Sequence, residues 1–259
     1  MSRILIQGGR VIDPSREFDQ VADLLLEDGR VAGINPAANA LPDQVIDAKG
    51  KIVAPGLIDM HAHLREPGFE EDETIATGTA SALVGGFASV VCMADSDPPI
   101  DTPAAVEFVQ HQATRADNCN VFVTAAVSQN RKGSQLAEMG HLARAGVVAF
   151  SDAAASLNDA NMMRRALEYS AMFNKPILNQ GAVAELAGEG LMHEGMVSML
   201  LGLPGIPDAA EKVMIGRDVV LCETTGGRVH VMHVSSADAV ELVRRAKGRK
   251  TQVTASVCP

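Results

Sequence analysis

The sequence predicts an α/β protein: an incomplete (β/α)8 barrel of the TIM type, preceded by a small β-sandwich portion. Three observations lead to this prediction. Short apolar segments separated by turn signals fill residues 1–51. From residue 52 onward, apolar strand-like segments alternate with helical segments, a pattern typical of parallel sheets covered by helices. No Gly-x-Gly-x-x-Gly sequence follows any of these strands, so a dinucleotide-binding fold has no support.

Residues 1–51 are predicted to form the sandwich portion. The expected strands are short and apolar, at Ile4–Ile6, Arg10–Ile12, Asp23–Leu26, Arg30–Ile34 and Val45–Ile46. The turn signals between them are Gly8-Gly9, Asp13-Pro14 and Asp28-Gly29. A sheet this small gains stability from additional strands, so we expect this portion to need further strands to close.

Residues 52–259 are predicted to form the barrel. Strands are expected at Ile52–Met60, Phe87–Met93, Val121–Val127, Val147–Phe150, Pro176–Leu178, Val229–Val234 and Gln252–Val257. Helices are expected at Glu71–Val84, Ala104–Arg115, Ser134–Ala145, Asn158–Phe173, Ala209–Thr224 and Ala237–Lys247. A closed barrel has eight strands and takes about 250 residues. Because 208 residues follow residue 51, we expect about seven strands and an incomplete barrel.

The composition excludes several classes of protein. The chain has 259 residues, of which 47% are hydrophobic and 3% aromatic, and its net charge is −10. No apolar run approaches 18 residues, so no membrane span is expected, and the first residues lack the pattern of a signal peptide. The acidic charge and the few aromatic residues argue against a nucleic-acid partner. The cysteines, Cys92, Cys119, Cys222 and Cys258, have no paired spacing, which favours reduced thiols and a cytoplasmic location.

The candidate site lies in residues 58–68. His61 and His63 are two residues apart at the end of an apolar run, so in a strand both imidazoles point to the same side. Two converging imidazoles can bind a metal ion such as zinc, and barrel enzymes usually place such ligands at the carboxyl ends of their strands. Arg65 follows with the same parity, and its planar guanidinium suits a carboxylate.

Three longer segments carry a resemblance to a known family. They are residues 46–68 (IDAKGKIVAPGLIDMHAHLREPG), 200–207 (LLGLPGIP) and 226–236 (GGRVHVMHVSS). On these segments the chain resembles the dihydroorotases of the long bacterial type, within the amidohydrolase superfamily of metal-dependent barrels. The resemblance covers residues 1–259. It implies a zinc-dependent hydrolase of cyclic amides that interconverts dihydroorotate and carbamoyl aspartate in pyrimidine biosynthesis, with a barrel and a sandwich built from both chain ends.

The resemblance also implies roles for individual residues. His61, His63 and His233 match the metal ligands, and Arg65 matches the residue that binds the substrate carboxylate. Asp95 stands at a second substrate-binding position. His230, three residues before His233, is interpreted as structural because it faces the other side of a regular strand. The acid/base Asp of the family lies on the eighth strand, beyond Pro259, so no catalytic residue is assigned in this sequence.

The chain departs from the family pattern at three positions, Ala153, Gln180 and Asp95. Ala153 replaces the Asp that bridges two metal ions, and the retained Asp152 is expected to face the opposite side. Gln180 replaces a ligating His, although a neutral amide oxygen is a poor zinc ligand. Asp95 replaces an Asn, which brings a negative charge close to a carboxylate-bearing substrate. Weak or partial zinc binding is therefore expected.

Two functions stay open. The first is an active amidohydrolase acting on dihydroorotate, with the missing part supplied by a longer native chain; the retained His61, His63 and Arg65 favour it. The second is a catalytically silent structural partner of aspartate transcarbamoylase, which the substitutions favour. A hydantoinase- or allantoinase-type enzyme is set aside, because the carboxylated Lys with which those relatives bridge two metal ions has no counterpart on residues 147–155. The resemblance also implies possible homo-oligomers.

Overall fold

The computed structural model describes residues 2–36 and 41–258. Contacts divide the chain into two compact units, residues 1–57 and 58–259, and each unit is described by itself. No helix in the described ranges is both long and apolar enough to cross a membrane.

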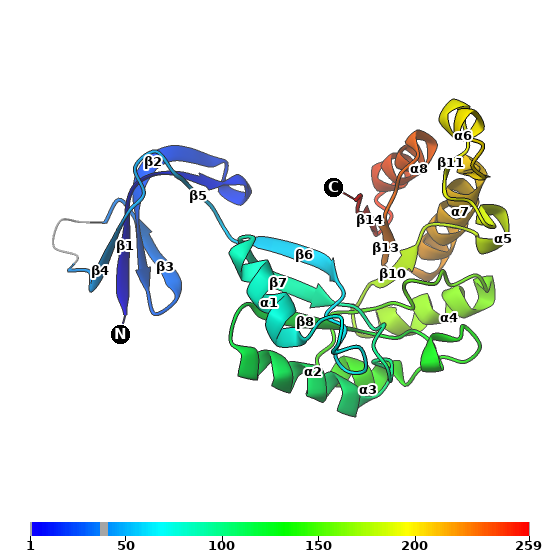
Figure 1. Ribbon diagram of the computed structural model, residues 1–259, viewed down its shortest axis with the longest axis horizontal. Helices are drawn as coiled ribbons and strands as arrows, with labels where there is room; N and C mark the ends of the chain where they lie inside the picture. Colours follow the sequence, from blue (N-terminus) through cyan, green and yellow to red (C-terminus); the bar gives the residue numbers. More distant parts are fainter. Residues whose placement is uncertain (1, 37–40, 259) are drawn as a thin grey trace. The chain divides into compact units, whose positions relative to one another are not determined.

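The first unit contains one mixed sheet of five described strands. They are β1 (Arg3–Asp13), β2 (Phe18–Glu27), β3 (Arg30–Ile34), β4 (Gln44–Asp47) and β5 (Ile52–Val53), with the short 3-10 helix η1 (Pro14–Arg16) between β1 and β2. β2 runs antiparallel to β1 and to β3, whereas β4 and β5 both pair with β1 in parallel. The central strand β1 thus organises the sheet (Figure 1).

Two expectations for this region were wrong. Gly8-Gly9 does not separate two strands, because β1 continues through both residues with a register shift between Ile6 and Gly9. Gly8 has φ +72°, and a Cβ on Gly9 would lie 2.6 Å from Cγ2 of Val53; the two glycines therefore allow a bulge and a close approach of β5. The single strand expected at Ile52–Met60 is two strands, since the residues between β5 and β6 include Pro55, which cannot donate a ladder hydrogen bond.

The second unit contains a curled sheet of seven described strands. They are β6 (Leu57–Ala62), β7 (Phe87–Cys92), β8 (Asn120–Ala125), β9 (Ala149–Phe150), β10 (Ile177–Gln180), β13 (Val229–Met232) and β14 (Val253–Ala255). Their spatial order is β14-β13-β10-β9-β8-β7-β6, and every pair with a described register is parallel. The predicted fold class, a barrel of about seven strands, is confirmed (Figure 1).

Helices follow the strands as the alternating pattern predicts. They are α1 (Ile75–Val84), α2 (Pro103–Ala116), α3 (Met139–Arg144), α4 (Ala160–Ala171), α7 (Asp208–Thr225) and α8 (Ala237–Gly248). The side chains of Thr74, Thr102, Asp159 and Ser236 cap the amino ends of α1, α2, α4 and α8. Smaller elements are the 3-10 helix η2 (Gln129–Arg131), α5 (Ala184–Ala187), α6 (Met196–Leu201), and the strand pair β11 (Met192–His193) and β12 (Gly205–Ile206).

The sheet has two faces with different roles. One face packs against the helices in a large core that includes Ile75, Cys92, Phe150, Ile215 and Cys222. On the other face a smaller cluster is formed by Met93, Ala149, Ala153, Leu178 and Met232. Side chains near the carboxyl ends of the strands therefore divide between the helical core and the inner face of the curl, where the candidate site lies.

The helical core dominates the stability of this unit. We expect Phe150→Ala, at a fully buried position on β9, to lower the free energy of unfolding by about 3–5 kcal/mol, since it removes a large side chain and leaves a cavity. Urea unfolding measures this loss. The matched control is Phe122→Ala on the neighbouring strand β8, where the side chain is 43% exposed and the loss should be less than half as large. Equal losses for the two variants would contradict this placement of the core.

Candidate functional site

Three imidazoles meet on the inner face of the curled sheet. The Nε2 atoms of His61 and His63 are 3.0 Å apart, and the ring centroids of His61 and His233 are 4.6 Å apart. His61 lies in β6 and His233 directly follows β13, two strands that are far apart in the sheet order. Only the curl of the sheet brings their carboxyl ends together. The structure thus gathers the three residues assigned as metal ligands, while their metal-binding role stays a prediction.

Hydrogen bonds assign the tautomers of two of these rings. Nδ1 of His63 lies 2.6 Å from Oδ2 of Asp95. Because the carboxylate accepts the Nδ1 proton, Nε2 of His63 keeps its lone pair, the arrangement that orients metal-ligating histidines in many proteins. Nε2 of His61 then donates to Nε2 of His63, and the buried Nδ1 of His61 is left without a partner.

The two neighbouring imidazoles and burial keep His61 neutral. Burial lowers the pKa of His61 to about 4, and the nearby charges of His63 and His233 act in the same direction. Asp95 responds in the opposite sense: burial alone raises the pKa of its carboxyl, but the hydrogen bond and charge of His63, with smaller contributions from the backbone and Arg131, together outweigh burial, and the net pKa is lowered. A neutral imidazole beside an ionised carboxylate is compatible with binding one cation.

Arg65 shares Asp95 with His63. Its Nη1 lies 3.4 Å from Oδ2 of Asp95, and its side chain is 39% exposed, so part of the guanidinium stays accessible. The negative charge of Asp95 is therefore partly balanced by Arg65. The predicted repulsion between Asp95 and a carboxylate ligand is weakened by this pairing.

The bridging position holds no donor atom. Ala153 is buried and packs in the inner cluster. The carboxylate of Asp152 accepts hydrogen bonds from the backbone nitrogens of Val127 and Ser128, at 2.8 and 3.1 Å, and from the hydroxyl of Ser128. Asp152 is thus fully used within the loop after β8 and does not take the place of the missing ligand.

Gln180 contacts an imidazole and leaves the ligand position with a neutral amide. Its Oε1 lies 3.3 Å from Nδ1 of His233, which therefore donates to the amide. His230, three residues before His233, is buried. Its Nδ1 lies 2.8 Å from the hydroxyl of Thr254 on β14. Burial also lowers the pKa of His230. These contacts support the interpretation of His230 as a structural residue.

The residues fit one weakly held cation and do not fit a pair of metal ions. Catalytic zinc generally has three protein ligands and a water. Within residues 2–36 and 41–258, no group of three or more His, Cys, Asp or Glu side chains is placed to hold a metal ion. The two Nε2 atoms of His61 and His63 are the donors that converge most closely. A bound zinc ion would lower the pKa of its water to near 7.

Sequence reasoning missed a pocket beside His233. This pocket has a volume of about 240 Å³ and is lined by His193, Ile206, Glu211 and Ser235, among others. Nε2 of His193 lies 2.9 Å from the hydroxyl of Ser235. The carboxylate of Glu211 accepts four hydrogen bonds, from the backbone nitrogens and hydroxyls of Ser235 and Ser236. The one sign of this pocket in the sequence was Glu211, a charged residue in the first turn of α7.

Arg131 was also missed, and nothing in the sequence pattern marks it. Its Nη2 donates to the carbonyl oxygens of Asp152 and Ala153. Its guanidinium therefore lies directly at the strand end where the bridging ligand was expected.

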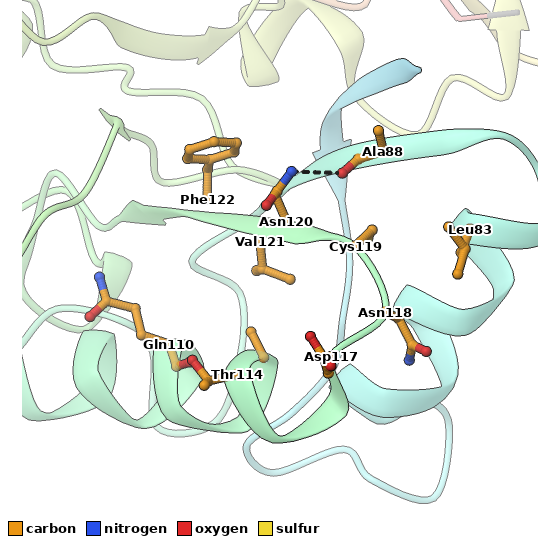
Figure 2. A pocket seen from close by; sticks show the side chains of 11 residues that line it. Leu83, Ala88, Gln110, Thr114, Asp117, Asn118, Cys119, Asn120, Val121 and Phe122 are labelled. Atoms are coloured by element: carbon orange, nitrogen blue, oxygen red, sulfur yellow. Dashed lines mark hydrogen bonds between the residues drawn. The ribbon is translucent and has the colours of Figure 1, made fainter. Parts of the chain in front are cut away.

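A larger pocket lies at the opposite end of the strands. It has a volume of about 560 Å³ and is lined by residues at the amino ends of β7 and β8 and the carboxyl ends of α1 and α2 (Figure 2). Two of its amides are committed to the backbone. Nδ2 of Asn120 donates to the carbonyl oxygen of Ala88 (Figure 2), and Nδ2 of Asn118 donates to that of Ala76. This pocket is remote from the histidines and is best explained as a gap between helix ends.

The fold and the site together define a class of protein. The structure superposes on an L-hydantoinase from Arthrobacter aurescens with a TM-score of 0.81 at 21% identity, covering 99% of this chain and 58% of that one. A D-hydantoinase gives a TM-score of 0.79 at 23% identity, covering 100% of this chain and 57% of that one. These likenesses show the fold alone.

The sequence comparisons give the family. The model for dihydro-orotase-like proteins matches residues 50–239. Dihydroorotases from Syntrophus aciditrophicus and Pelotomaculum thermopropionicum are each 46% identical over 99% of this chain, and a putative dihydroorotase from Rhodopirellula baltica is 43% identical over 98%. The chain belongs to the dihydroorotase-like family. It spans 56–61% of the length of these relatives.

The lowered pKa of His61 predicts a pH-dependent stability. Between about pH 6.5 and 4 the unfolded chain binds a proton at this position and the folded chain does not, so stability falls as pH falls through this window. We expect a loss on the order of 2 kcal/mol, after allowing for solvent screening. Urea unfolding from pH 7.5 to 4 measures it.

The comparison of two variants isolates His61. His61→Gln should flatten this part of the stability profile, whereas His141→Gln, at an exposed position, should leave it unchanged. Parallel profiles for the wild type and His61→Gln would show that folding does not lower the pKa of His61.

Proposed function

We propose that this chain is a dihydroorotase-type cyclic amidohydrolase whose turnover is strongly impaired. The observation that carries the proposal is that the two predicted ligand positions, Ala153 and Gln180, hold side chains that bind zinc poorly or not at all. Ala153 is 1% exposed and offers no donor, and Gln180 is hydrogen-bonded to His233 through its amide. A bound metal ion would supply an activated water for opening a cyclic amide at neutral pH, and the residues that would hold a second metal ion are replaced.

Substrate binding is better supported than turnover. Dihydroorotate carries a carboxylate, and the partly exposed guanidinium of Arg65 lies beside the histidines. His61 and His63 keep the geometry of a two-ligand pair, with the carboxylate of Asp95 behind His63. We therefore propose dihydroorotate as the small-molecule ligand and zinc as the metal, bound weakly by the histidine pair.

Two measurements on the purified chain test this proposal. We expect well under one zinc ion per chain after dialysis, measured by elemental analysis, because two neutral ligands hold zinc poorly. We expect dihydroorotate hydrolysis with and without added zinc to stay near the uncatalysed rate. One or two zinc ions per chain together with sustained turnover would refute the proposal that turnover is impaired.

A second candidate function has its own support. The chain is 43–46% identical to dihydroorotases over nearly its full length, yet its ligand positions are substituted. Retention of the scaffold without the ligands favours a structural role for this chain in a complex with another protein. We propose that this other protein is aspartate transcarbamoylase. Co-purification with the transcarbamoylase from the native host, in the absence of turnover, is the expected result; a chain that elutes free of it would argue against this partner.

Restoring both ligands should strengthen zinc binding. Ala153→Asp with Gln180→His adds a carboxylate and an imidazole where the amidohydrolase pattern has them, so we expect zinc affinity to rise by about tenfold or more. Calorimetry with a competing chelator measures the change. The matched control is Ala155→Asp with Gln135→His, which adds the same groups elsewhere and should leave the affinity unchanged. An unchanged affinity in the first variant, both with Arg131 present and after Arg131→Met, would show that Ala153 and Gln180 are not the ligand positions.

A further inference from the structure

The loop after β8 is folded back onto the strand end that carries Ala153. Asp152 holds it through the three hydrogen bonds from Val127 and Ser128. Within the loop, the hydroxyl of Ser128 accepts from the backbone nitrogen of Gly133 at 2.8 Å. The loop is further tied by Asp101, which accepts from the backbone nitrogen of Asn130 at 2.8 Å. Asp152 therefore serves as an anchor for this loop.

This loop delivers Arg131 to the site. Asn130 and Arg131 have φ values of 52° and 57°, and two successive non-glycine residues in the left-handed region are rare outside constrained segments. Nη2 of Arg131 donates to the carbonyl oxygens of Asp152 and Ala153. Its Nε is buried without a partner in the described structure. The fixed fork of the guanidinium thus lies against the backbone of the bridging position.

The charge of Arg131 acts on the two carboxylates nearest to this strand end, Asp95 and Asp152. It lowers the pKa of Asp95, together with the stronger effect of His63. At Asp152 it opposes the effect of burial, which raises the pKa of that carboxyl. A divalent cation beside Ala153 would lie within a few ångströms of this guanidinium, and like charges repel strongly where water is scarce.

We propose that Arg131 excludes a divalent metal ion from the position next to Ala153, its guanidinium occupying the place of that ion. This inference rests on the proposed function, because it gives the impaired site a second cause besides the lost ligands. Arg131 is thus a specificity-determining residue for metal binding, and it leaves the pair of His61 and His63 as the remaining cation site.

The test is a matrix of zinc affinities on the purified chain at fixed pH and salt. Arg131→Met is made in the wild type and in the Ala153→Asp, Gln180→His background. Removal of the charge should tighten zinc binding by about threefold in the wild type and about tenfold in the background that has the ligands. Zinc per chain should be higher in the triple variant than in the Ala153→Asp, Gln180→His background.

Three further variants separate charge from folding. Lys132→Met removes the same charge from the adjacent, exposed residue and should change zinc affinity by less than about twofold. Arg131→Lys keeps the charge and should bind zinc like the wild type. Arg131→Gln keeps donors for the two carbonyl oxygens without the charge, should bind like Arg131→Met, and replaces it if Arg131→Met unfolds.

The outcomes are distinct. Equal zinc affinities for Arg131→Gln, Arg131→Met and Lys132→Met in the background with restored ligands would overturn the proposal. Tightening in Arg131→Lys as large as in Arg131→Met would also overturn it, because geometry and not charge would be responsible. Turnover of dihydroorotate by the wild type would refute the proposed function, yet it would not alter these affinity ratios.

Discussion

The curl of the parallel sheet is the constraint on which the candidate site depends. β6 forms one edge of the sheet and β13 lies next to the other edge, yet the rings of His61 and His233 meet with centroids 4.6 Å apart. Helices packed on one face and a small apolar cluster on the other maintain this curl. A flat sheet of the same strands would separate the imidazoles by several strand spacings of about 4.8 Å each.

The residues predicted as metal ligands and their neighbours form a hydrogen-bonded cluster even where no ligating group is present. Asp95 still orients His63, and Asp152 still has a structural use. At the two positions without a ligating group, the neighbouring atoms are satisfied in other ways: Ala153 packs in the inner cluster, and Gln180 accepts from His233. Both residues are therefore compatible with a stable fold.

Much of the fold could be predicted from the sequence, because it depends on local alternation of apolar and helical segments. The positions of β7, β8 and the long helices follow from that pattern. The bulge at Gly8-Gly9 could not, since it depends on the approach of Val53 to β1. At the site, His61 and His63 were visible from their spacing. Arg131 was not, because only the hydrogen bonds of its loop bring it to Ala153.

One consequence concerns the thiol of Cys92, which lies in the core between the sheet and its helices. Burial raises its pKa to about 12, so in the folded chain almost none of this sulfur is in the reactive thiolate form. An alkylating reagent can reach it only when the helices part from the sheet. The rate at which Cys92 is alkylated therefore reports how often the curled sheet opens. The same opening would also separate the three imidazoles.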